Sequence, residues 1–322
     1  MAIQPPVRIG ARASALSQAQ SRQMQARIAA ALGVSPGPPP DEVEAAAPLV
    51  LITTTGDRIQ DRRLLEAGGK GLFVKELEEA LLDGRIDCAV HSFKDVPTVS
   101  PPGLVIAAIP EREDPRDAFV SPSHARLIDL PQGARLGTAS LRRQAQTLSL
   151  RPDLEVVMLR GNVDTRLAKL ERGEADAILL ALAGLRRLGL DGVVREALDP
   201  VAAPPAPGQG ALAIQTRAED AELLWLAALR HAPTALAVAA ERGALEALDG
   251  SCRTAIGAHA FVEAGQFHLV VEALSPDGAF KVRRQDQLGV PAAQAPEALA
   301  RELGLALGRQ VREEAADRIV FG

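Results

Sequence analysis

Short apolar runs alternate with stretches of helical periodicity through the first part of the chain. The run at residues 7–12 predicts a strand, and Ser14 then opens a helical pattern whose members recur every four residues. A Pro-rich loop is expected at 33–48. The same alternation continues with strands at 49–56, 87–93 and 104–109 and a helix at 72–82. This pattern predicts a mainly parallel sheet with helices on its faces.

The same order of elements restarts in the middle of the chain. It contains predicted strands at 135–140, 155–159 and 177–181, with helices that open at Ser140 and Asn162. A second α/β domain is the simplest interpretation. The Pro-rich stretch at 200–207 then resembles a crossing segment, and the apolar run at 210–215 is expected to return as a strand to the first domain.

The last part of the chain has a different pattern. A helix is expected beyond about residue 234, and two alternating runs at 255–262 and 267–274 flank a turn at 264–266, which indicates an antiparallel hairpin. An amphipathic helical segment at 296–319 closes the chain. These elements predict a third, smaller α+β domain.

We therefore expect an α/β protein of three domains. Domain 1 comprises residues 1–110 and 208–230, domain 2 comprises residues 111–207, and domain 3 comprises residues 231–322.

Composition and charge narrow the function classes. The 322 residues are 47% hydrophobic and 24% charged, which is a normal globular mixture, and the net charge of −5 argues against a protein that coats nucleic acid or an anionic membrane. The start of the chain has no basic segment followed by an apolar core, and no window approaches 18 uncharged apolar residues, so a soluble, cytoplasmic protein is expected. Two cysteines without histidines at ligand spacing make a disulfide framework and a structural zinc site poor hypotheses.

Arginines gather in domain 2. Residues 137–190 carry nine basic and six acidic residues in a chain whose net charge is negative. Many of the basic side chains follow predicted strands: Arg142, Arg143, Arg160, Arg166, Arg186 and Arg187. Ligands of open α/β sheets bind at the carboxyl ends of strands, where guanidinium groups suit carboxylates or phosphates. Solvated surface charge is the competing interpretation, and because no GxxxxGK[ST] run exists, a polycarboxylate ligand is at least as plausible as a phosphate.

Two further segments carry candidate chemistry. Lys94 and Asp95 follow a predicted strand directly, which suits acid–base work, although a surface ion pair has the same pattern. Lys70 lies among three glycines, which suggests a mobile lid or a plain flexible loop.

The two cysteines have different surroundings. Cys252 is predicted to lie in a loop between a helix and a strand, beside Arg253, which favours a reactive thiolate. Cys88 lies inside an apolar run and is predicted to be a buried core residue.

These segments together resemble the hydroxymethylbilane synthase family, also called porphobilinogen deaminase. The resemblance rests on nine motifs in order: RIGARASAL (8–16), GGKGLFVKELEEALL (68–82), HSFKDVP (91–97), EREDPRDAFVS (111–121), GTASLRRQ (137–144), LRGNVDTRL (159–167), AGLRRLGL (183–190), PGQGALAI (207–214) and GSCRTAIG (250–257). They cover residues 8 to about 257, and the rest of the chain matches mainly in length and pattern.

The resemblance implies a fold and an activity. The implied fold has two periplasmic-binding-protein-like α/β domains around a cleft and a smaller C-terminal α+β domain. The implied activity is that of a transferase in porphyrin, tetrapyrrole and heme biosynthesis, which joins four porphobilinogen molecules head to tail, releases ammonia and forms hydroxymethylbilane. Its primer is a dipyrromethane, which is held by a thioether on the cysteine that matches Cys252.

The resemblance also assigns site residues. Asp95 matches the catalytic aspartate, which acts as proton donor or as an ionised electrostatic stabiliser of the electron-poor azafulvenium; we favour the second role. Cofactor carboxylates would be bound by a set of polar side chains: Ser92, Lys94, Thr138, Ser140, Arg142, Arg143 and Arg166. Incoming substrate would be bound by Arg12, Ser14, Arg160 and Arg187, with Phe73 stacked on a pyrrole ring and Lys70 in the lid loop.

No metal is expected in this site. The expected partners are porphobilinogen and the growing pyrrole chain, with no nucleic acid and no membrane, and a monomer is expected. The alternative from another class is a non-catalytic two-domain anion-binding module, because the hinged fold is shared with solute-binding proteins. The lack of a secretion signal and of a helix-turn-helix region counts against that alternative.

Overall fold

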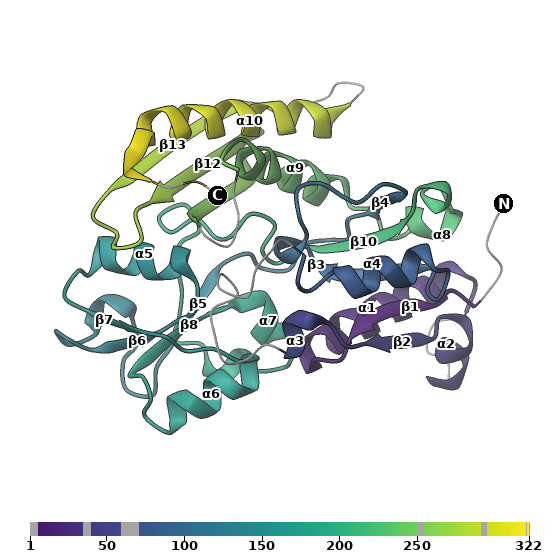
Figure 1. Ribbon diagram of the computed structural model, residues 1–322, viewed down its shortest axis with the longest axis horizontal. Coiled ribbons are helices and arrows are strands. Elements are labelled where there is room, and N and C mark those ends of the chain that lie inside the picture. The colour runs from purple at the N-terminus through teal and green to yellow at the C-terminus, as the bar shows by residue number, and fades with distance from the viewer. Residues whose placement is uncertain are drawn as a thin grey trace. The chain divides into compact units, whose positions relative to one another are not determined.

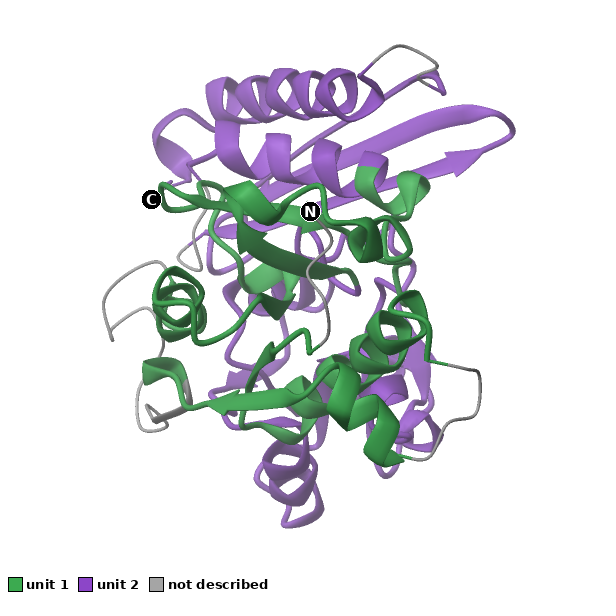
Figure 2. Ribbon diagram, turned by 90° about the vertical axis from the view of Figure 1, so that its right-hand side faces the viewer, with its two compact units in different colours: residues 1–62, 68–113, 211–235 green, residues 63–67, 114–210, 236–322 purple. Residues whose placement is uncertain are grey.

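The chain divides into two compact units. The computed structural model describes residues 6–34, 40–58, 71–249, 254–290, 295–319 and 321 (Figure 1). Unit 1 contains the described residues up to 113 together with 211–235, and unit 2 contains those of 114–210 and 236–322 (Figure 2). Because the second sheet and the C-terminal sheet fall in one unit, the division into three domains stays a prediction.

Unit 1 is built on a five-stranded sheet of order β2-β1-β3-β10-β4. Its strands are β1 (Ile9–Arg12), β2 (Leu49–Ile52), β3 (Cys88–Ser92), β4 (Leu104–Ala108) and β10 (Leu212–Arg217). β1 runs parallel to β2 and β3, whereas β10 runs antiparallel to β3 and β4. The predicted return of the chain to the first sheet is confirmed by β10. The expectation of a mainly parallel sheet is confirmed, because β4 runs in the same direction as β1, β2 and β3, and β10 enters from a distant segment as the antiparallel strand.

Helices cover both faces of this sheet. α1 (Ala15–Ala31) begins at Ser14, whose hydroxyl accepts a hydrogen bond from the Ser17 backbone N–H at 3.4 Å, as is usual for an N-cap. Its apolar side chains pack into one core cluster, while α4 (Lys75–Leu82) packs Leu77 and Leu81 into another. The predicted helix start at Ser14 is confirmed.

Two short helices lie where the sequence predicts a loop and the end of a strand. α2 (Pro40–Ala46) lies in the expected Pro-rich loop, because proline suits the first turn of a helix and two acidic residues there complement the helix dipole. α3 (Thr55–Arg58) replaces the end of the predicted strand at 49–56, since the Gly56 N–H donates to the Leu72 carbonyl at 2.8 Å instead of to a neighbouring strand. The short elements η1 (Phe93–Asp95), η4 (Ala218–Asp220) and α8 (Leu224–Ala227) complete the description of unit 1.

Unit 2 contains a second five-stranded sheet of order β7-β6-β8-β5-β9. Its strands are β5 (Asp117–Val120), β6 (Arg135–Gly137), β7 (Glu155–Val157), β8 (Ala177–Ala181) and β9 (Glu196–Ala197). β6 is parallel to β7 and β8, and β5 is antiparallel to β8 and β9. The accompanying helices are α5 (Leu141–Leu150), α6 (Val163–Glu171) and α7 (Leu182–Arg187), with η2 (Leu127–Asp129) and η3 (Asp191–Val193). Ser140 and Asn162 cap α5 and α6, as predicted.

A three-stranded antiparallel sheet forms the C-terminal part of unit 2. It comprises β11 (Ala255–Glu263), β12 (Gln266–Leu274) and β13 (Lys281–Gly289), covered on one face by α9 (Ala232–Ala247) and α10 (Pro296–Ala315), followed by η5 (Ala316–Arg318) (Figure 1). The predicted hairpin and closing helix are confirmed, and the predicted fold class of α/β sheets with a smaller C-terminal α+β part is confirmed.

The C-terminal sheet packs directly on α5. Ala145 of α5 forms a small apolar cluster with Ala255 and Leu274. Next to it, the turn between β12 and β13 approaches the helix so closely that a Cβ atom on Gly278 would lie 2.4 Å from the Ala145 carbonyl oxygen. Helix α5 is therefore fixed between the two sheets of unit 2.

Candidate active site

Asp95 lies at the carboxyl end of a central strand of unit 1. β3 ends at Ser92, and the turn η1 then buries Phe93, whose backbone N–H donates to the Ala211 carbonyl at 3.0 Å. The Val96 N–H closes the turn on the Phe93 carbonyl at 3.1 Å. Between these anchored neighbours, Asp95 is exposed. Lys94 in the same turn is half-buried.

A small pocket surrounds Asp95. It is lined by Arg12, Ser17, Gln20, Phe73, Val74, Val90, His91, Ser92 and Asp95, all of which belong to unit 1. Four predicted site residues therefore meet here: Arg12, Phe73, Ser92 and Asp95. Ser14 is not among the lining residues, and its hydroxyl caps α1.

The pocket residues are held by specific contacts. The guanidinium of Arg12 lies over the ring of Phe73, and the Arg12 backbone N–H donates to the Ser17 hydroxyl at 3.1 Å. Ser92 exchanges hydrogen bonds with the amide of Gln20, which lies 2.9 Å from the hydroxyl through Nε2. One cation, one exposed carboxylate and several hydroxyl and amide groups thus converge on one strand end, an arrangement that suits a charged, polar substrate.

His91 was not among the predicted site residues, yet it lines the same pocket. Its Nε2 lies 2.9 Å from Oε1 of Gln215, and the Gln215 amide nitrogen donates to Glu78 at 3.1 Å. Burial, together with the nearby charge of Arg12, lowers the pKa of His91 to about 4, although the Gln215 contact acts in the opposite direction. The imidazole is therefore neutral at physiological pH, and Nε2 donates to Gln215. The sequence signal that could have identified His91 as a site residue is its position in the motif HSFKDVP, three residues after Cys88.

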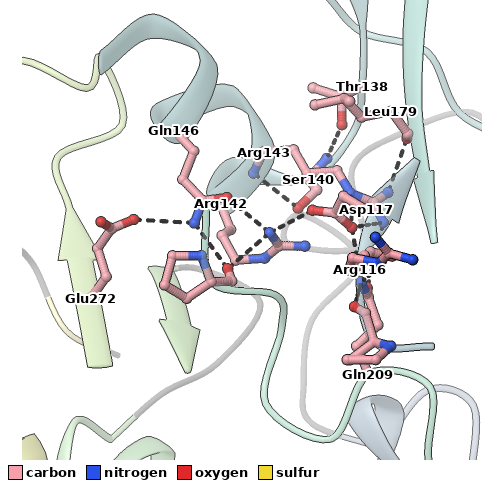
Figure 3. Close-up of polar contacts among 12 residues, drawn as sticks. Arg116, Asp117, Thr138, Ser140, Arg142, Arg143, Gln146, Leu179, Gln209 and Glu272 are labelled. Atoms are coloured by element: carbon pink, nitrogen blue, oxygen red, sulfur yellow. Dashed lines mark hydrogen bonds and ion pairs between the residues drawn. The ribbon is translucent and has the colours of Figure 1, made fainter. Parts of the chain in front are cut away.

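In unit 2, Arg142 and Arg143 share one buried carboxylate, Asp117 (Figure 3). Arg142 Nη1 donates to Oδ2 of Asp117 at 2.7 Å, and Arg143 donates to Oδ1 from Nε at 3.1 Å and from Nη2 at 2.8 Å. Gln209 adds a further hydrogen bond to Oδ1 at 2.8 Å. Burial raises the pKa of Asp117, but the charges of the two arginines outweigh it and hold the pKa far below the ordinary range of a carboxyl. Asp117 is thus ionised at any physiological pH.

The same cluster reaches the C-terminal sheet through Gln146. Its side-chain oxygen accepts a hydrogen bond from Arg142 at 2.8 Å, and its amide nitrogen donates to Glu272 of β12 at 3.1 Å (Figure 3). Thr138 and Ser140 order the start of α5, because the Ser140 N–H donates to the Thr138 hydroxyl at 3.1 Å and the Ser140 hydroxyl accepts from the Arg143 N–H. The structure therefore brings four predicted cofactor residues together: Thr138, Ser140, Arg142 and Arg143.

Two of the remaining predicted arginines donate to backbone carbonyls of unit 2. Arg166 Nε donates to the Gly161 carbonyl at 2.7 Å, and Arg187 Nη2 donates to the Gly210 carbonyl at 2.7 Å. Arg160 is half-buried, and within the described residues its buried Nη1 atom has no hydrogen-bond partner. The same holds for the buried Nε atom of Arg142. Buried guanidinium nitrogens in this state fit an anionic ligand such as a carboxylated cofactor.

Lys70 and Cys252 lie outside the described residues, as does Arg253. Cys88 is a fully buried core residue, as predicted, and burial raises the pKa of its thiol well above the usual range, so it is not a reactive thiolate. Within the part of the chain that the structure describes, no group of three or more His, Cys, Asp or Glu side chains is placed to hold a metal ion. Among the described helices, none has the length and apolar character that a membrane span requires.

Comparison with known proteins gives matches along the whole chain. The family model described as porphobilinogen deaminase, dipyromethane cofactor binding domain, matches residues 7–224, and the model described as porphobilinogen deaminase, C-terminal domain, matches residues 235–313. The porphobilinogen deaminase of Caulobacter vibrioides (strain NA1000 / CB15N) is 67% identical over 321 residues, covering 100% of this chain and 99% of the relative. That of Phenylobacterium zucineum (strain HLK1) is 66% identical and covers 100% of both chains.

Similar solved structures are more distant. The methionine binding protein MetQ is 14% identical with a TM-score of 0.42, and the match covers 69% of this chain and 89% of that chain. A periplasmic substrate-binding protein of an ABC transporter from Coxiella burnetii is 16% identical with a TM-score of 0.42, covering 74% and 97%.

Proposed function

This chain belongs to the porphobilinogen deaminase family, and on that premise we propose that it is a transferase that joins porphobilinogen molecules head to tail, releases ammonia and forms the linear tetrapyrrole hydroxymethylbilane. The observation that carries this proposal is 67% identity to a porphobilinogen deaminase over essentially the full length of both chains. Four substrate molecules would enter each product, as the family resemblance implies.

The cofactor would be a dipyrromethane on Cys252. Of the two cysteines, Cys88 is buried with a raised thiol pKa, whereas the neighbour of Cys252 in the sequence is a cation that favours thiolate. When bound, the dipyrromethane supplies the pyrrole end to which the first substrate is joined. The buried Nε of Arg142, which has no hydrogen-bond partner in the described part of the chain, supports the fit of a carboxylated group beside α5.

The polar side chains would divide between cofactor and substrate. Each pyrrole carries an acetate and a propionate, so the growing chain accumulates carboxylates that require charged hydrogen-bond donors. We assign the cofactor carboxylates to Ser92, Lys94, Thr138, Ser140, Arg142, Arg143 and Arg166, and incoming substrate to Arg12, Ser14, Phe73, Arg160 and Arg187, with Lys70 in a lid loop.

Asp95 would act on the charge that the reaction develops. Loss of ammonia from porphobilinogen leaves an electron-poor azafulvenium whose positive charge lies near the pyrrole N–H. An exposed carboxylate at the end of β3, in a pocket that also contains Arg12, is well placed to stabilise such a cation. We therefore favour electrostatic stabilisation by ionised Asp95 over proton donation.

We also propose a cytoplasmic monomer that has neither nucleic acid nor membrane as a partner. The net charge of −5 supports the absence of nucleic acid and membrane partners, because binding to nucleic acid or to an anionic membrane usually requires an excess of positive charge.

Intact mass combined with a product assay tests the proposed function. The purified protein is expected to be heavier than its sequence by one dipyrromethane and to convert porphobilinogen to hydroxymethylbilane with release of ammonia. Cys252→Ser should remove the mass increment, and Cys88→Ser is the matched control that should keep it. An unmodified mass in active wild-type protein would contradict the covalent primer, and binding of porphobilinogen without turnover would favour a non-catalytic binding module.

A further inference from the structure

Asp117 fixes the relative orientation of two guanidinium groups. One carboxylate oxygen accepts a hydrogen bond from Arg142 and the other accepts hydrogen bonds from Arg143 (Figure 3). Each arginine therefore binds a different oxygen atom of the same planar carboxylate. The Asp117 side chain is 1% exposed, and those of Arg142 and Arg143 are 5% and 7% exposed. Water therefore cannot replace these contacts, and the orientation of both arginines depends on Asp117.

The cluster is not electrically balanced. Two buried guanidinium ions face a single carboxylate, and the other groups that they contact are neutral: the side chains of Gln146 and Gln209 and the carbonyls of Pro204 and Leu179. Buried charges in proteins are normally paired, because removal of an ion from water is costly. Glu272, which accepts a hydrogen bond from Gln146, has its own cation in Arg283 at 3.6 Å, so one positive charge at the start of α5 is left for a further anion.

The two arginines also differ in their remaining donors. All three nitrogens of Arg143 already donate to acceptors within unit 2, two of them to Asp117 and the third to the Leu179 carbonyl. Arg142 directs only Nη1 to such acceptors, and its buried Nε has no hydrogen-bond partner among the described residues. The buried guanidinium nitrogen that has no acceptor among the described residues therefore belongs to Arg142, and Asp117 determines where it lies.

We propose that Asp117 is a positioning residue for primer binding, which holds Arg142 and Arg143 in one arrangement so that Arg142 keeps a nitrogen for a carboxylate of the dipyrromethane. This inference rests on the proposed function. We assign Asp117 no contact with the primer, because its side chain is 1% exposed and both of its oxygens accept hydrogen bonds from side chains of unit 2.

The test compares primer loading in three full-length variants. In Asp117→Asn, the amide has one acceptor oxygen and one donor nitrogen, so one of the two guanidiniums must face a donor. Asp117→Glu keeps the charge but moves the carboxylate by one methylene. Asp176→Asn is the matched control. Asp176 also forms an ion pair with an arginine of unit 2, because Nη2 of Arg135 lies 2.9 Å from its Oδ1, but both of these side chains are partly exposed.

The measurements are the intact mass of the folded fraction and the rate at which primer-free protein gains the dipyrromethane increment during incubation with porphobilinogen. Circular dichroism selects folded protein, so a loss of stability alone does not lower the measured rate. Asp117→Asn and Asp117→Glu are each expected to load at least roughly tenfold more slowly than wild type. Asp176→Asn should load at the wild-type rate.

Loading of folded Asp117→Asn at the wild-type rate would overturn the proposal. Wild-type loading of Asp117→Glu would also overturn it, because the charge alone would then suffice, and this charged variant decides the question where the Asn variant does not fold. If the proposed function is wrong, the wild-type protein itself carries no dipyrromethane increment. The mass of the wild-type protein therefore distinguishes failure of the proposed function from failure of this inference.

Discussion

The guanidinium carbon of Arg12 lies 4.1 Å from the centroid of the Phe73 ring, so that the cation covers one face of the aromatic ring. Gly56 approaches the same ring, since a Cβ atom at residue 56 would lie 2.3 Å from it. Phe73 is therefore held between Arg12 and the backbone at Gly56. Its role includes orienting the arginine that we assign to substrate carboxylates.

Replacement of Phe73 by Leu should weaken substrate binding more than turnover. Loss of a cation–π contact removes an attraction of about 0.5–2 kcal/mol, so KM for porphobilinogen should rise about 2- to 30-fold while kcat changes less. Steady-state kinetics on the primer-loaded enzyme measure both constants. Phe261→Leu, in the C-terminal hairpin, is the control and should leave KM unchanged. A fall in kcat at constant KM would assign Phe73 to the chemical step instead.

Asp95→Asn should separate binding from chemistry. The amide keeps the shape of the side chain but cannot balance a developing positive charge, so turnover should fall at least ~100-fold while the dipyrromethane mass increment is retained. Intact mass and ammonia release are measured on the same sample. Asp83→Asn changes another exposed carboxylate of unit 1 and should have little effect. Near-normal activity of the Asp95 variant would mean that another group stabilises the cation.

Arg142→Leu and Arg160→Leu should fail at different stages. Arg142→Leu removes the donor beside α5 and one partner of buried Asp117, so we expect protein without primer whose stability is lower by about 3–5 kcal/mol. Arg160→Leu should carry the primer but stall during elongation, because the half-buried Arg160 is assigned to incoming substrate. Mass spectra of purified protein and of its covalent complexes with substrate distinguish these outcomes. Normal primer loading in Arg142→Leu would contradict its assignment.

His91 should make the protein less stable as the pH falls. Its pKa is about 4 in the folded chain and 6.5 in the reference state, so between these values the unfolded chain binds a proton that the folded chain does not. Stability conferred by neutral His91 is fully present above about pH 6.5 and falls as the pH approaches 4. Urea unfolding at pH 7 and pH 5 should therefore differ by about 2 kcal/mol from this group. His91→Gln should remove that difference, and an unchanged difference in the variant would assign it to other groups.

Local signals in the sequence predicted the helix starts well. Ser14, Ser140 and Asn162 each precede a helical pattern, and each side chain accepts a hydrogen bond from a backbone N–H in the first turn. The capping interaction spans only three residues, so the sequence contains nearly all of the information. The hairpin of β11 and β12 was predicted for the same reason, because its strands are joined by a short turn.

Apart from the return of β10 to the first sheet, contacts between distant segments were missed. β5 pairs with β8, which lies about sixty residues further along the chain, and β13 is a polar edge strand without a clear alternation. Asp117 is the most informative case for the site. It lies in the quoted motif EREDPRDAFVS, yet its partners Arg142 and Arg143 are 25 and 26 residues away, and only the pairing of the second sheet brings them together.

Gly278, which has no side chain, allows helix α5 to lie where it does and thereby affects the positions of Arg142 and Arg143. Its φ of +70° and the 2.4 Å that would separate a Cβ atom from the Ala145 carbonyl oxygen leave room for no other residue. A side chain there would push the helix that carries Arg142 and Arg143 away from the C-terminal sheet. Under the proposed role of Arg142 and Arg143, a substitution at Gly278 would therefore impair primer attachment although Gly278 is assigned to neither primer nor substrate. A mutational scan interpreted only by distance from the active site would misclassify that substitution.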